Sequence, residues 1–369
     1  MTKLVFETNE LSAALREVRG AVQRRNTIPI LANVLIEAGA DGAAKLTTTD
    51  LDVVVTRRLA ATAVEGAIAL TVDAHRLADV VGSFATGSQT TIDCSPGCAL
   101  VTSGRARIRF ATLPSESFPS IEQKTVVSRF TIDAKALSRG IGTVRHAIST
   151  EETRYYLNGI FWHVCDGRLV YVATDGNRLA RYRDALPDGA AEMPDTILRT
   201  RCIELARAAA EARDTDVEVS IGDGKVVMVA GDYRLLAKVI DGTFPDYTRV
   251  IPSSHTSTLK IDRDALHEGL SRVLVAVTDR VRSVKLELDR DVVRASVSSP
   301  EHGMAVEEMP CAFDGAAFEI GFNGRYLRDA LDVLDVDVLE VRLTDAASPT
   351  VITSSEASDV TLLLMPMRV

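Results

Sequence analysis

The stretch Phe130–Ile148, FTIDAKALSRGIGTVRHAI, contains the pattern around which the whole chain is organised. It begins with a short apolar alternation, Phe130 and Ile132, that favours a β-strand, and Asp133 then interrupts the alternation. The apolar residues that follow recur at steps of four, three and four, which places them on one helical face: Leu137, Ile141, Val144 and Ile148. The segment therefore predicts a strand, a helix cap and an amphipathic helix.

The same pattern occurs twice more in the chain. The leucines that open the three helical faces are Leu11, Leu137 and Leu266, so the periods are 137 − 11 = 126 and 266 − 137 = 129 residues. A second helical pattern follows each of these leucines, after 77 − 11 = 66, 203 − 137 = 66 and 327 − 266 = 61 residues. This periodicity indicates one domain repeated three times.

Each repeat has the composition of an α+β domain. Strands with one apolar face, such as Arg105–Phe110 with its alternating arginines, are typical of antiparallel sheet that is covered on one side. We therefore predict two helices packed on antiparallel sheet in each repeat. Short polar segments, Glu122–Ser128 and Pro252–Thr258, separate the repeats. The expected domains are residues 1–125, 126–253 and 254–369.

The composition is that of an ordinary globular protein, with 46% apolar and 25% charged residues in 369. No apolar run has the length of a signal peptide or a membrane span. The five cysteines are odd in number and scattered, which favours reduced thiols and a cytoplasmic location.

The formal net charge of −9 argues at first against binding to nucleic acid. The distribution of charge matters more than the total, however, and many arginines lie on the predicted helices. Two interpretations remain open, namely solvated helix faces or a basic helical inner face with an acidic exterior. The arginines on or beside the helices include Arg16, Arg19, Arg25, Arg139, Arg145, Arg199, Arg201, Arg272 and Arg325.

Six local motifs are distributed over the chain in order. They are Thr27–Leu31 (TIPIL), Thr48–Leu51 (TTDL), Arg154–Gly159 (RYYLNG), Ala173–Ala180 (ATDGNRLA), Asp241–Tyr247 (DGTFPDY) and Met365–Arg368 (MPMR). Together they resemble the bacterial sliding clamp family, the beta subunit of DNA polymerase III. The resemblance implies a head-to-tail homodimer that closes into a ring around duplex DNA and contacts it without reading sequence. It also implies processivity in DNA replication, with no cofactor, no metal and no catalysis.

The resemblance further implies a pocket for a short linear motif, carried by the DNA polymerase III catalytic subunit, the clamp loader, other polymerases and repair proteins. Apolar side chains beside arginine suit a peptide with aliphatic and aromatic anchors. A C-terminal strand that completes a core, with a turn at Asp175–Gly176, is the alternative explanation. The residues that match the family's pocket are Leu157, Thr174, Gly176, Asn177, Arg178, Leu179, Pro245, Arg249, Val250, Leu363, Met365, Pro366, Met367 and Arg368.

The positions expected near DNA are basic or aromatic. Tyrosines beside arginines can stack on bases or bind phosphates, although paired tyrosines also serve in packing. Glu151 lies close to this group, and a carboxylate near phosphates would be unfavourable. The expected DNA-contacting residues are Arg25, Arg154, Tyr155, Tyr156, Arg199 and Arg201.

The ring implies a seam between the edge strand Arg105–Phe110 of one chain and the third repeat of another. An apolar edge strand without a partner would favour aggregation, although a plain solvated strand is the competing interpretation. The residues expected at this seam are Arg105, Arg107, Ile108, Phe110, Val275, Ala276, Glu307 and Glu308.

An enzyme is the second class of protein that the sequence allows. Thr174–Gly176 with Arg178 could serve a phosphohydrolase, and Gly222–Lys225 could be a phosphate loop, but the latter lacks the spacing of a P-loop and fits a hairpin turn. The histidines have no metal-ligand spacing. We therefore expect a non-catalytic clamp, with a clamp paralogue specialised for repair or resistance, or a phosphoester-processing enzyme, as alternatives.

Overall fold

The computed structural model describes residues 2–23, 25–39, 41–213, 215–275, 283–299, 303–354 and 359–368. The chain divides into two compact units, each of which is described by itself. The first unit comprises Met1–Ser138, Pro187–Pro194 and Arg199–Val239. The second comprises Arg139–Leu186, Asp195–Leu198 and Ile240–Val369.

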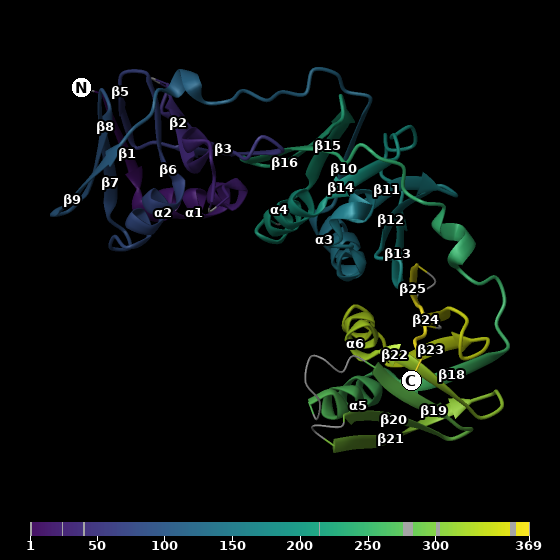
Figure 1. The fold of residues 1–369 in the computed structure, drawn as a ribbon. Coiled ribbons are helices and arrows are strands. Elements are labelled where there is room, and N and C mark those ends of the chain that lie inside the picture. The colour runs from purple at the N-terminus through teal and green to yellow at the C-terminus, as the bar shows by residue number, and fades with distance from the viewer. Residues whose placement is uncertain are drawn as a thin grey trace. The chain divides into compact units, whose positions relative to one another are not determined.

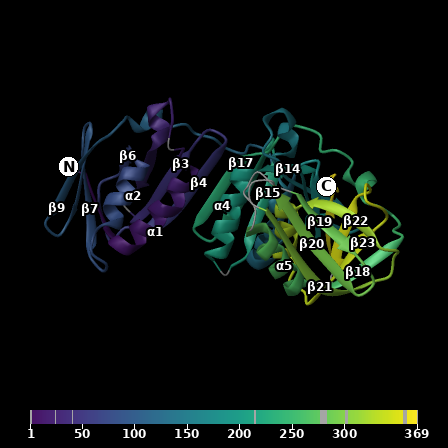
Figure 2. The same cartoon turned by 60° about the horizontal axis from the view of Figure 1, so that its bottom comes forward.

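The first repeat places helices α1 (Thr8–Val18) and α2 (Ala74–Gly82) side by side, as Figures 1 and 2 both show. The Asp73 carboxylate caps α2 by accepting from the backbone N–H of Arg76 at 2.8 Å. The strands are β1 (Thr2–Glu7), β2 (Asn33–Ala38), β3 (Ala43–Thr49), β4 (Val53–Ala60), β5 (Ala63–Glu65), β6 (Ile68–Asp73), β7 (Gln89–Ser95), β8 (Cys98–Ser103) and β9 (Ala106–Ala111), with 3₁₀ turns η1 (Arg19–Ala21), η2 (Pro29–Ala32) and η3 (Ser115–Ser117).

The middle repeat contains helices α3 (Ala134–Val144) and α4 (Thr200–Glu211). The segment Gly222–Lys225 is a hairpin turn between two of its strands, with Asp223 and Gly224 at positive φ, as expected. The strands are β10 (Ser128–Ile132), β11 (Gly159–Cys165), β12 (Arg168–Thr174), β13 (Arg178–Ala185), β14 (Thr196–Arg199), β15 (Val217–Gly222), β16 (Lys225–Ala230) and β17 (Tyr233–Lys238), with 3₁₀ turns η4 (Arg145–Ala147), η5 (Glu152–Leu157) and η6 (Tyr247–Val250).

The third repeat contains helices α5 (Arg263–Val275) and α6 (Gly324–Asp332), which pack against each other. The Asn323 side chain caps α6 by accepting from the backbone N–H groups of Arg325 and Tyr326. The strands are β18 (Ser257–Asp262), β19 (Ser283–Leu288), β20 (Val292–Ser299), β21 (Gly303–Phe313), β22 (Phe318–Asn323), β23 (Val338–Leu343), β24 (Thr350–Ser354) and β25 (Val360–Leu364).

The strand order confirms the threefold repeat. One group of four strands has the order β6-β2-β3-β4 in the first repeat, β14-β11-β12-β13 in the second and β22-β19-β20-β21 in the third. The other group has the orders β1-β7-β8-β9, β10-β15-β16-β17 and β18-β23-β24-β25. The fold is therefore three copies of two helices with antiparallel sheet, as the periodicity predicts.

Two antiparallel strand pairs join neighbouring repeats into continuous sheets. At the first junction β4 pairs with β17, and Val54 lies opposite Leu236. At the second junction β13 pairs with β25, and Leu179 lies opposite Leu363. Each compact unit contains one of these junctions, which explains why the division between the units falls inside the middle repeat.

The helical faces read from the sequence are buried, but some element ends differ from expectation. Leu137, Ile141 and Val144 of α3 are at most 1% exposed. In the first repeat the apolar residues Leu11, Leu15, Val18 and Val22 predict a helix from Glu10 to Val22. Helix α1 instead ends at Val18 and continues only as the 3₁₀ turn η1. In the part of the chain that the structure describes, no helix is long and apolar enough to cross a membrane.

Candidate functional site

The loop between β12 and β13, Thr174–Arg178, is held by hydrogen bonds from its own side chains. The Asp175 carboxylate accepts from the backbone N–H groups of Asn177 at 2.8 Å and Arg178 at 3.0 Å. The Thr174 hydroxyl donates to the Arg178 carbonyl at 2.7 Å and accepts from the Gly176 N–H at 3.1 Å. Gly176 has φ +90°, a left-handed conformation in which glycine is unstrained. The loop is therefore rigid and begins β13 at a fixed place.

Arg178 joins this loop to the third repeat. Its guanidinium binds Asp175 at 3.1 Å and Asp329 of α6 at 2.7 Å, and it lies 4.0 Å from the ring centroid of Tyr326. The arginine side chain is only 11% exposed, so these charge pairs are weakly screened by solvent. The contacts fix β13 against α6 at the second junction.

A buried apolar cluster forms the base of the site. Leu157, Leu179 and Leu363 are 2 to 4% exposed and belong to this cluster. The Phe244 ring stacks on Phe161 at 4.8 Å between centroids, so the chain before η6 is anchored to β11. The other buried members are Val170, Val172, Ile197, Ile240, Tyr247 and Val351.

Exposed apolar side chains lie close in sequence to members of this cluster. Val250 is 48% exposed, and Met365 and Met367 are each 39% exposed. The tail after β25 is docked by its backbone, because the Met365 N–H donates to the Asn177 carbonyl at 2.8 Å and the Met367 N–H to the Gly321 carbonyl at 2.9 Å. Pro245 and Arg249, beside Val250, are also exposed, as is Arg368 at the end of the tail. The second unit thus contains every residue expected in the peptide pocket, with a buried apolar base and with exposed Met, Pro, Val and Arg side chains.

His146 lies close behind the Arg178 contacts, in η4. Burial and, to a smaller extent, the neighbouring Arg178 charge together lower the pKa of this histidine to about 4. Its Nδ1 atom is buried without a hydrogen-bond partner among the described residues. The imidazole is therefore neutral at physiological pH.

The residues expected near DNA are divided between the two units. Arg154, Tyr155 and Tyr156 lie in η5 of the second unit, and Glu151 binds Arg154 at 2.8 Å. This ion pair offsets the negative charge of Glu151, which we expected to be unfavourable near DNA phosphates. Arg25, Arg199 and Arg201 belong to the first unit, where Arg201 donates to the Gly20 carbonyl.

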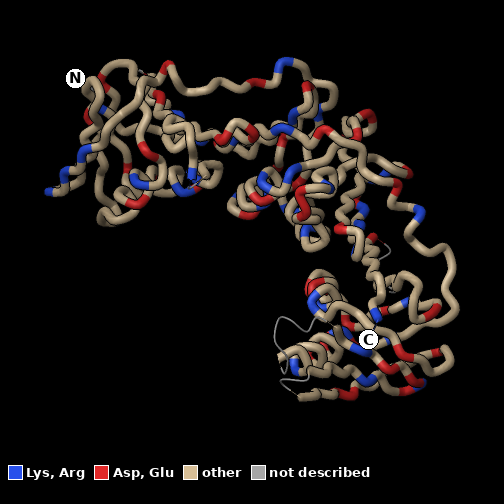
Figure 3. Tube along the Cα trace, viewed as in Figure 1, with Lys and Arg blue, Asp and Glu red and all other residues tan. Residues whose placement is uncertain are grey.

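The helices do not carry a purely basic surface. Figure 3 shows basic and acidic residues interspersed along the chain. On α4, for example, Arg201 lies 3.7 Å from Glu204, and Arg207 lies 2.7 Å from Glu211. The positive charge of the arginines on α4 is thus partly neutralised by glutamates of the same helix.

The residues expected at the seam lie on two strands and one helix end. In β9, Arg107 is exposed, Ile108 is half-buried and Phe110 is 8% exposed, so the Phe110 ring already belongs to the core of its own repeat. Arg105 is exposed in the turn before β9, and Val275 at the end of α5 is 86% exposed. Glu307 and Glu308 of β21 bind Arg272 and Arg294 at 2.9 and 2.5 Å, and Ala276 lies outside the described residues.

Models of three protein-family domains match successive parts of the chain. They are the N-terminal domain of the DNA polymerase III beta subunit over residues 2–122, the central domain over 131–246 and the C-terminal domain over 248–368. The beta sliding clamp of Caulobacter vibrioides is 38% identical over 100% of both chains. The beta sliding clamp of Escherichia coli is 31% identical over 99% of this chain and 100% of its own.

The chain belongs to the bacterial beta sliding clamp family. Its function is that of a DNA sliding clamp. Solved structures agree, since a sliding clamp of Bartonella birtlesii bound to griselimycin superposes with a TM-score of 0.97 at 34% identity over 100% of both chains. A beta sliding clamp of Caulobacter crescentus, with polyethylene glycol bound to a putative beta-motif tethering region, superposes with a TM-score of 0.96 at 37% identity over 100% of this chain and 99% of its own.

Sequence reasoning missed several residues that contact the expected pocket residues of this clamp. Tyr326 and Asp329 hold Arg178, while Phe161 and Tyr247 support the base. The only signal for Tyr326 and Asp329 was their place in the second helical pattern of the third repeat. Tyr247 was quoted in the Asp241–Tyr247 motif, but nothing in that motif indicates that its ring packs inward.

Proposed function

We infer that this clamp forms a head-to-tail homodimeric ring that encloses duplex DNA. The observation that carries the inference is the pairing of equivalent strands. β4, β13 and β21 are equivalent in the three repeats, as are β9, β17 and β25. Two of the three possible pairs, β4 with β17 and β13 with β25, occur within the chain.

The third pair, β21 with β9, requires a second copy of the chain in a head-to-tail dimer. Among the described residues β9 pairs only with β8. One edge of β21 pairs with β20, and on its other edge, in the described part of the chain, only residues 311–313 are paired, with β18. The N-terminal part of β21 presents Met304, which is 73% exposed, and Val306, which is 41% exposed. Edge strands of this kind are normally covered. We propose that β9 of a second copy covers this edge, in the antiparallel sense of the other two junctions.

DNA enclosed by such a ring would be contacted through its phosphates. Arg25, Arg154, Arg199 and Arg201 supply positive charge, and Tyr155, which is 52% exposed, together with Tyr156 supplies aromatic rings. Phosphate contacts are independent of sequence and weaken as salt rises, which suits a protein that slides. We propose no catalytic role for any of these residues.

We propose that the expected pocket residues of the second unit form a groove, and that this groove binds the short linear motif of the DNA polymerase III catalytic subunit, the clamp loader, other polymerases and repair proteins. Its apolar base suits aliphatic and aromatic anchors, and methionine at the rim can adapt to different ligands. The proposed domain limits remain 1–125, 126–253 and 254–369, and the proposed location is the cytoplasm.

Enclosure of DNA by a ring is tested by comparing retention of the clamp on circular and on linear DNA. The fluorescently labelled clamp is loaded on a nicked circular plasmid, excess protein is removed by gel filtration, and half of the sample is cut with a restriction enzyme. We expect retention on the circle and loss from the linear product within the time of a second gel filtration. Equal retention on both forms would indicate ordinary DNA binding and would refute enclosure.

A further inference from the structure

The 3₁₀ turn η6 (Tyr247–Val250) carries part of the expected peptide pocket. Arg249 and Val250 lie in it and Pro245 precedes it, and all three are exposed. Tyr247 is the one buried residue of the turn, at 6% exposed. A single 3₁₀ turn has few hydrogen bonds of its own. The direction in which its exposed residues point therefore depends on what holds the Tyr247 side chain.

His163 of β11 holds the Tyr247 hydroxyl. The imidazole Nε2 lies 3.0 Å from the tyrosine oxygen. The His163 ring stacks on Phe161 at 4.6 Å between centroids, and Phe161 stacks in turn on Phe244 at 4.8 Å. The segment that enters η6 is therefore attached to β11 twice, by ring stacking at Phe244 and by a hydrogen bond at Tyr247.

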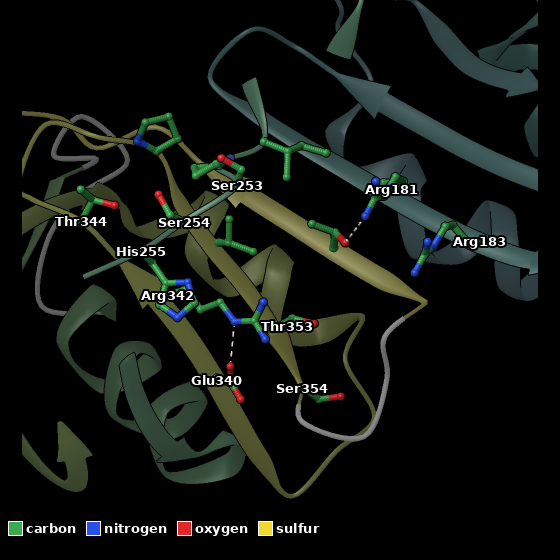
Figure 4. A pocket seen from close by; sticks show the side chains of 15 residues that line it. Arg181, Arg183, Ser253, Ser254, His255, Glu340, Arg342, Thr344, Thr353 and Ser354 are labelled. Carbon is green, nitrogen blue, oxygen red and sulfur yellow. Dashed lines mark hydrogen bonds and ion pairs between the residues drawn. The ribbon is translucent and has the colours of Figure 1, made fainter. Parts of the chain in front are cut away.

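Arg181 of β13 approaches the same hydroxyl. Burial raises the pKa of Tyr247, and the Arg181 guanidinium opposes this through its charge and a hydrogen bond to the hydroxyl. The guanidinium also donates to the Thr361 hydroxyl of β25 at 2.9 Å, shown by the dashed line at Arg181 in Figure 4, which restrains its position. An arginine can only donate, so the tyrosine oxygen accepts from it. The tyrosine O–H is then left to donate to His163.

The imidazole must be neutral to accept that proton. Burial lowers the pKa of His163, the Asp195 carboxylate and a backbone hydrogen bond at Val164 oppose this, and the Arg181 charge lowers the pKa again. A backbone group that raises the pKa of an imidazole accepts its N–H. The single proton of the neutral ring is thus placed on Nδ1, and the Nε2 lone pair is free for Tyr247.

Protonation of His163 disrupts this arrangement. Nε2 then carries an N–H, so the tyrosine O–H can no longer donate to it, and two donors compete for one oxygen. The positive charges of His163 and Arg181 would also face each other across the hydroxyl. The charge of Asp195, which precedes β14, offsets part of this repulsion but does not restore the hydrogen bond.

The first junction lacks these groups. The Phe-Pro pairs at residues 118 and 244 are 244 − 118 = 126 residues apart, so Ile121 occupies the place of Tyr247. At the same spacing Glu37 of β2 stands where β11 has His163, and it binds Lys45 at 3.0 Å. The hydrogen-bonded chain is thus specific to the second junction and does not follow from the repeat.

We propose that His163 is a positioning residue for the peptide groove. Through the Tyr247 hydroxyl it holds η6 in the orientation that presents Pro245, Arg249 and Val250, and its protonation weakens peptide binding in acid. This inference rests on the proposed binding of a short linear motif by the second unit and adds to it a residue that touches no peptide.

The proposal is tested by fluorescence anisotropy of a rhodamine-labelled Gln-Leu-Ser-Leu-Phe peptide with both ends blocked, so that the peptide itself does not titrate. The full-length chain is titrated into it between pH 8 and pH 5 at constant ionic strength. We expect a constant affinity above about pH 6.5 and a loss of about threefold or more between pH 6.5 and pH 5. The neutral imidazole makes the hydrogen bond and the charged one does not, which fixes the sign.

Two variants remove the hydrogen bond. His163→Phe keeps a ring to stack on Phe161 but cannot accept the tyrosine proton, and Tyr247→Phe removes the hydroxyl. Each should weaken peptide binding at pH 7.5 by about threefold to tenfold and flatten the pH profile. Because both remove the same contact, the double variant should be little weaker than either single one.

A conservative variant and a matched control separate positioning from packing. His163→Gln supplies an amide oxygen that can accept from Tyr247 but does not titrate, so it should recover most of the affinity that His163→Phe loses, without the decline in acid. His255→Gln removes an exposed histidine of the same unit and should change neither the affinity nor the profile. Near-ultraviolet circular dichroism at each pH checks that every variant is folded.

The role of His163 is refuted if His163→Phe binds the peptide as tightly as the unmodified chain at pH 7.5. It is also refuted if His163→Gln keeps the decline in acid while His146→Gln loses it, because His146 beside Arg178 would then be the titrating group. Absence of peptide binding by the unmodified chain would refute the groove itself and the role of His163 with it. Binding that no His163 variant changes would refute the role of His163 alone.

Discussion

The two junctions between repeats contain loops with the same hydrogen bonds, but the side chains packed around the two loops differ. At the first junction the Asp50 carboxylate accepts from the backbone N–H groups of Asp52 at 3.0 Å and Val53 at 2.8 Å, and the Thr49 hydroxyl donates to the Val53 carbonyl at 2.8 Å. The loop Thr174–Arg178 repeats this arrangement 125 residues later, as 174 − 49 = 125.

The side chains around the two loops are different. Leu51 has φ +77° at the first junction, where Gly176 has φ +90° at the second. Val53 occupies the position of Arg178, and the buried cluster at the first junction consists of Val54, Val227 and Leu236. The ten-residue cluster at the second junction includes the equivalents of all three.

The comparison teaches that the hydrogen-bonded loop is part of the scaffold, whereas the residues of the proposed groove come from substitutions on it. The first junction is closed by charge pairs, in which Glu17 of α1 binds Arg57 at 3.0 Å and Arg213 at 2.7 Å. The second junction instead uses Arg178, the aromatic rings of Phe244 and Tyr247, and the docked tail.

The largest expected effect concerns the proposed third junction, between β9 and β21 of two copies. Ile108→Asp should convert the dimer to a monomer, because an unpaired charge would lie in the strand pair at a cost of several kcal/mol. Val306→Asp on the exposed edge of β21 should do the same, and since Val306 is 41% exposed, folding of the monomer is spared. Sedimentation velocity measures the mass, and an unchanged dimer in both variants would refute the seam.

The next effect concerns the docked tail, which the first junction lacks. Deletion of residues 365–369 should reduce the affinity for a Gln-Leu-x-Leu-Phe peptide at least ~100-fold, because the exposed methionines of the rim are lost. Fluorescence anisotropy of a labelled peptide measures the affinity. As a control, Val275→Ala changes an exposed apolar residue outside the groove and should leave peptide binding intact. Full affinity in a folded, truncated protein would place the groove elsewhere.

Much of the fold was predictable because its signals are local. The faces of α1, α3 and α5, the repeat period and the hairpin at Gly222–Lys225 depend on residues close together in sequence. The apolar residues of Leu51–Leu59 predict a strand that begins at Leu51, but β4 begins at Val53, since the left-handed Leu51 belongs to the loop. An alignment of Thr48–Asp50 (TTD) with Ala173–Asp175 (ATD) as equivalent positions would have revealed this loop.

The site was less predictable because its contacts are remote in sequence. Asp329, which binds Arg178, is 151 residues away along the chain, and no periodicity connects the two. Tyr247 and His163, whose side chains are 3.0 Å apart, are separated by 84 residues. The family motifs indicate which residues to propose for the groove, but only the folded chain shows the buried contacts beside them.

The replacement of Val53 by Arg178 is the largest difference in side-chain chemistry between the two loops. Arg178→Ala should lower the free energy of unfolding by about 2 kcal/mol, because Asp329 and Asp175 lose a charged hydrogen-bond partner that is little exposed. Urea unfolding followed by the fluorescence of Trp162, which is fully buried in the same unit, measures the loss. Val53→Ala is the equivalent change at the first junction and should leave the Trp162 transition unchanged. Equal shifts of that transition would show that Arg178 does not stabilise its junction specifically.

His146 makes the second junction sensitive to acid. Its folded pKa of about 4 is below the unfolded value of 6.5, so the neutral form stabilises the fold fully above about pH 6.5, and this stabilisation is lost as the pH falls towards 4. The equivalent position in η1 is Gly20, which does not titrate. His146→Gln should therefore flatten the decline of the melting temperature between pH 6.5 and pH 4.5. An unchanged profile would assign the acid sensitivity to other groups.

The smallest effect comes from exchanging the residues at the left-handed position of each loop. Gly176→Ala should destabilise the second junction by about 1 kcal/mol, because alanine at positive φ is strained and its Cβ would lie 2.6 Å from Nη1 of Arg154. The guanidinium is the flexible end of a side chain and can move, so the backbone strain remains as the main cost. Leu51→Gly relieves the same strain at the first junction, but the extra freedom of glycine in the unfolded chain offsets the gain, so the change should stay below about 0.5 kcal/mol. Urea midpoints from Trp162 fluorescence for Gly176→Ala and from circular dichroism for Leu51→Gly measure the two effects. If Gly176→Ala were neutral, the loop would adapt to a side chain at that position, and glycine there would have to be explained by the approach of a bound peptide.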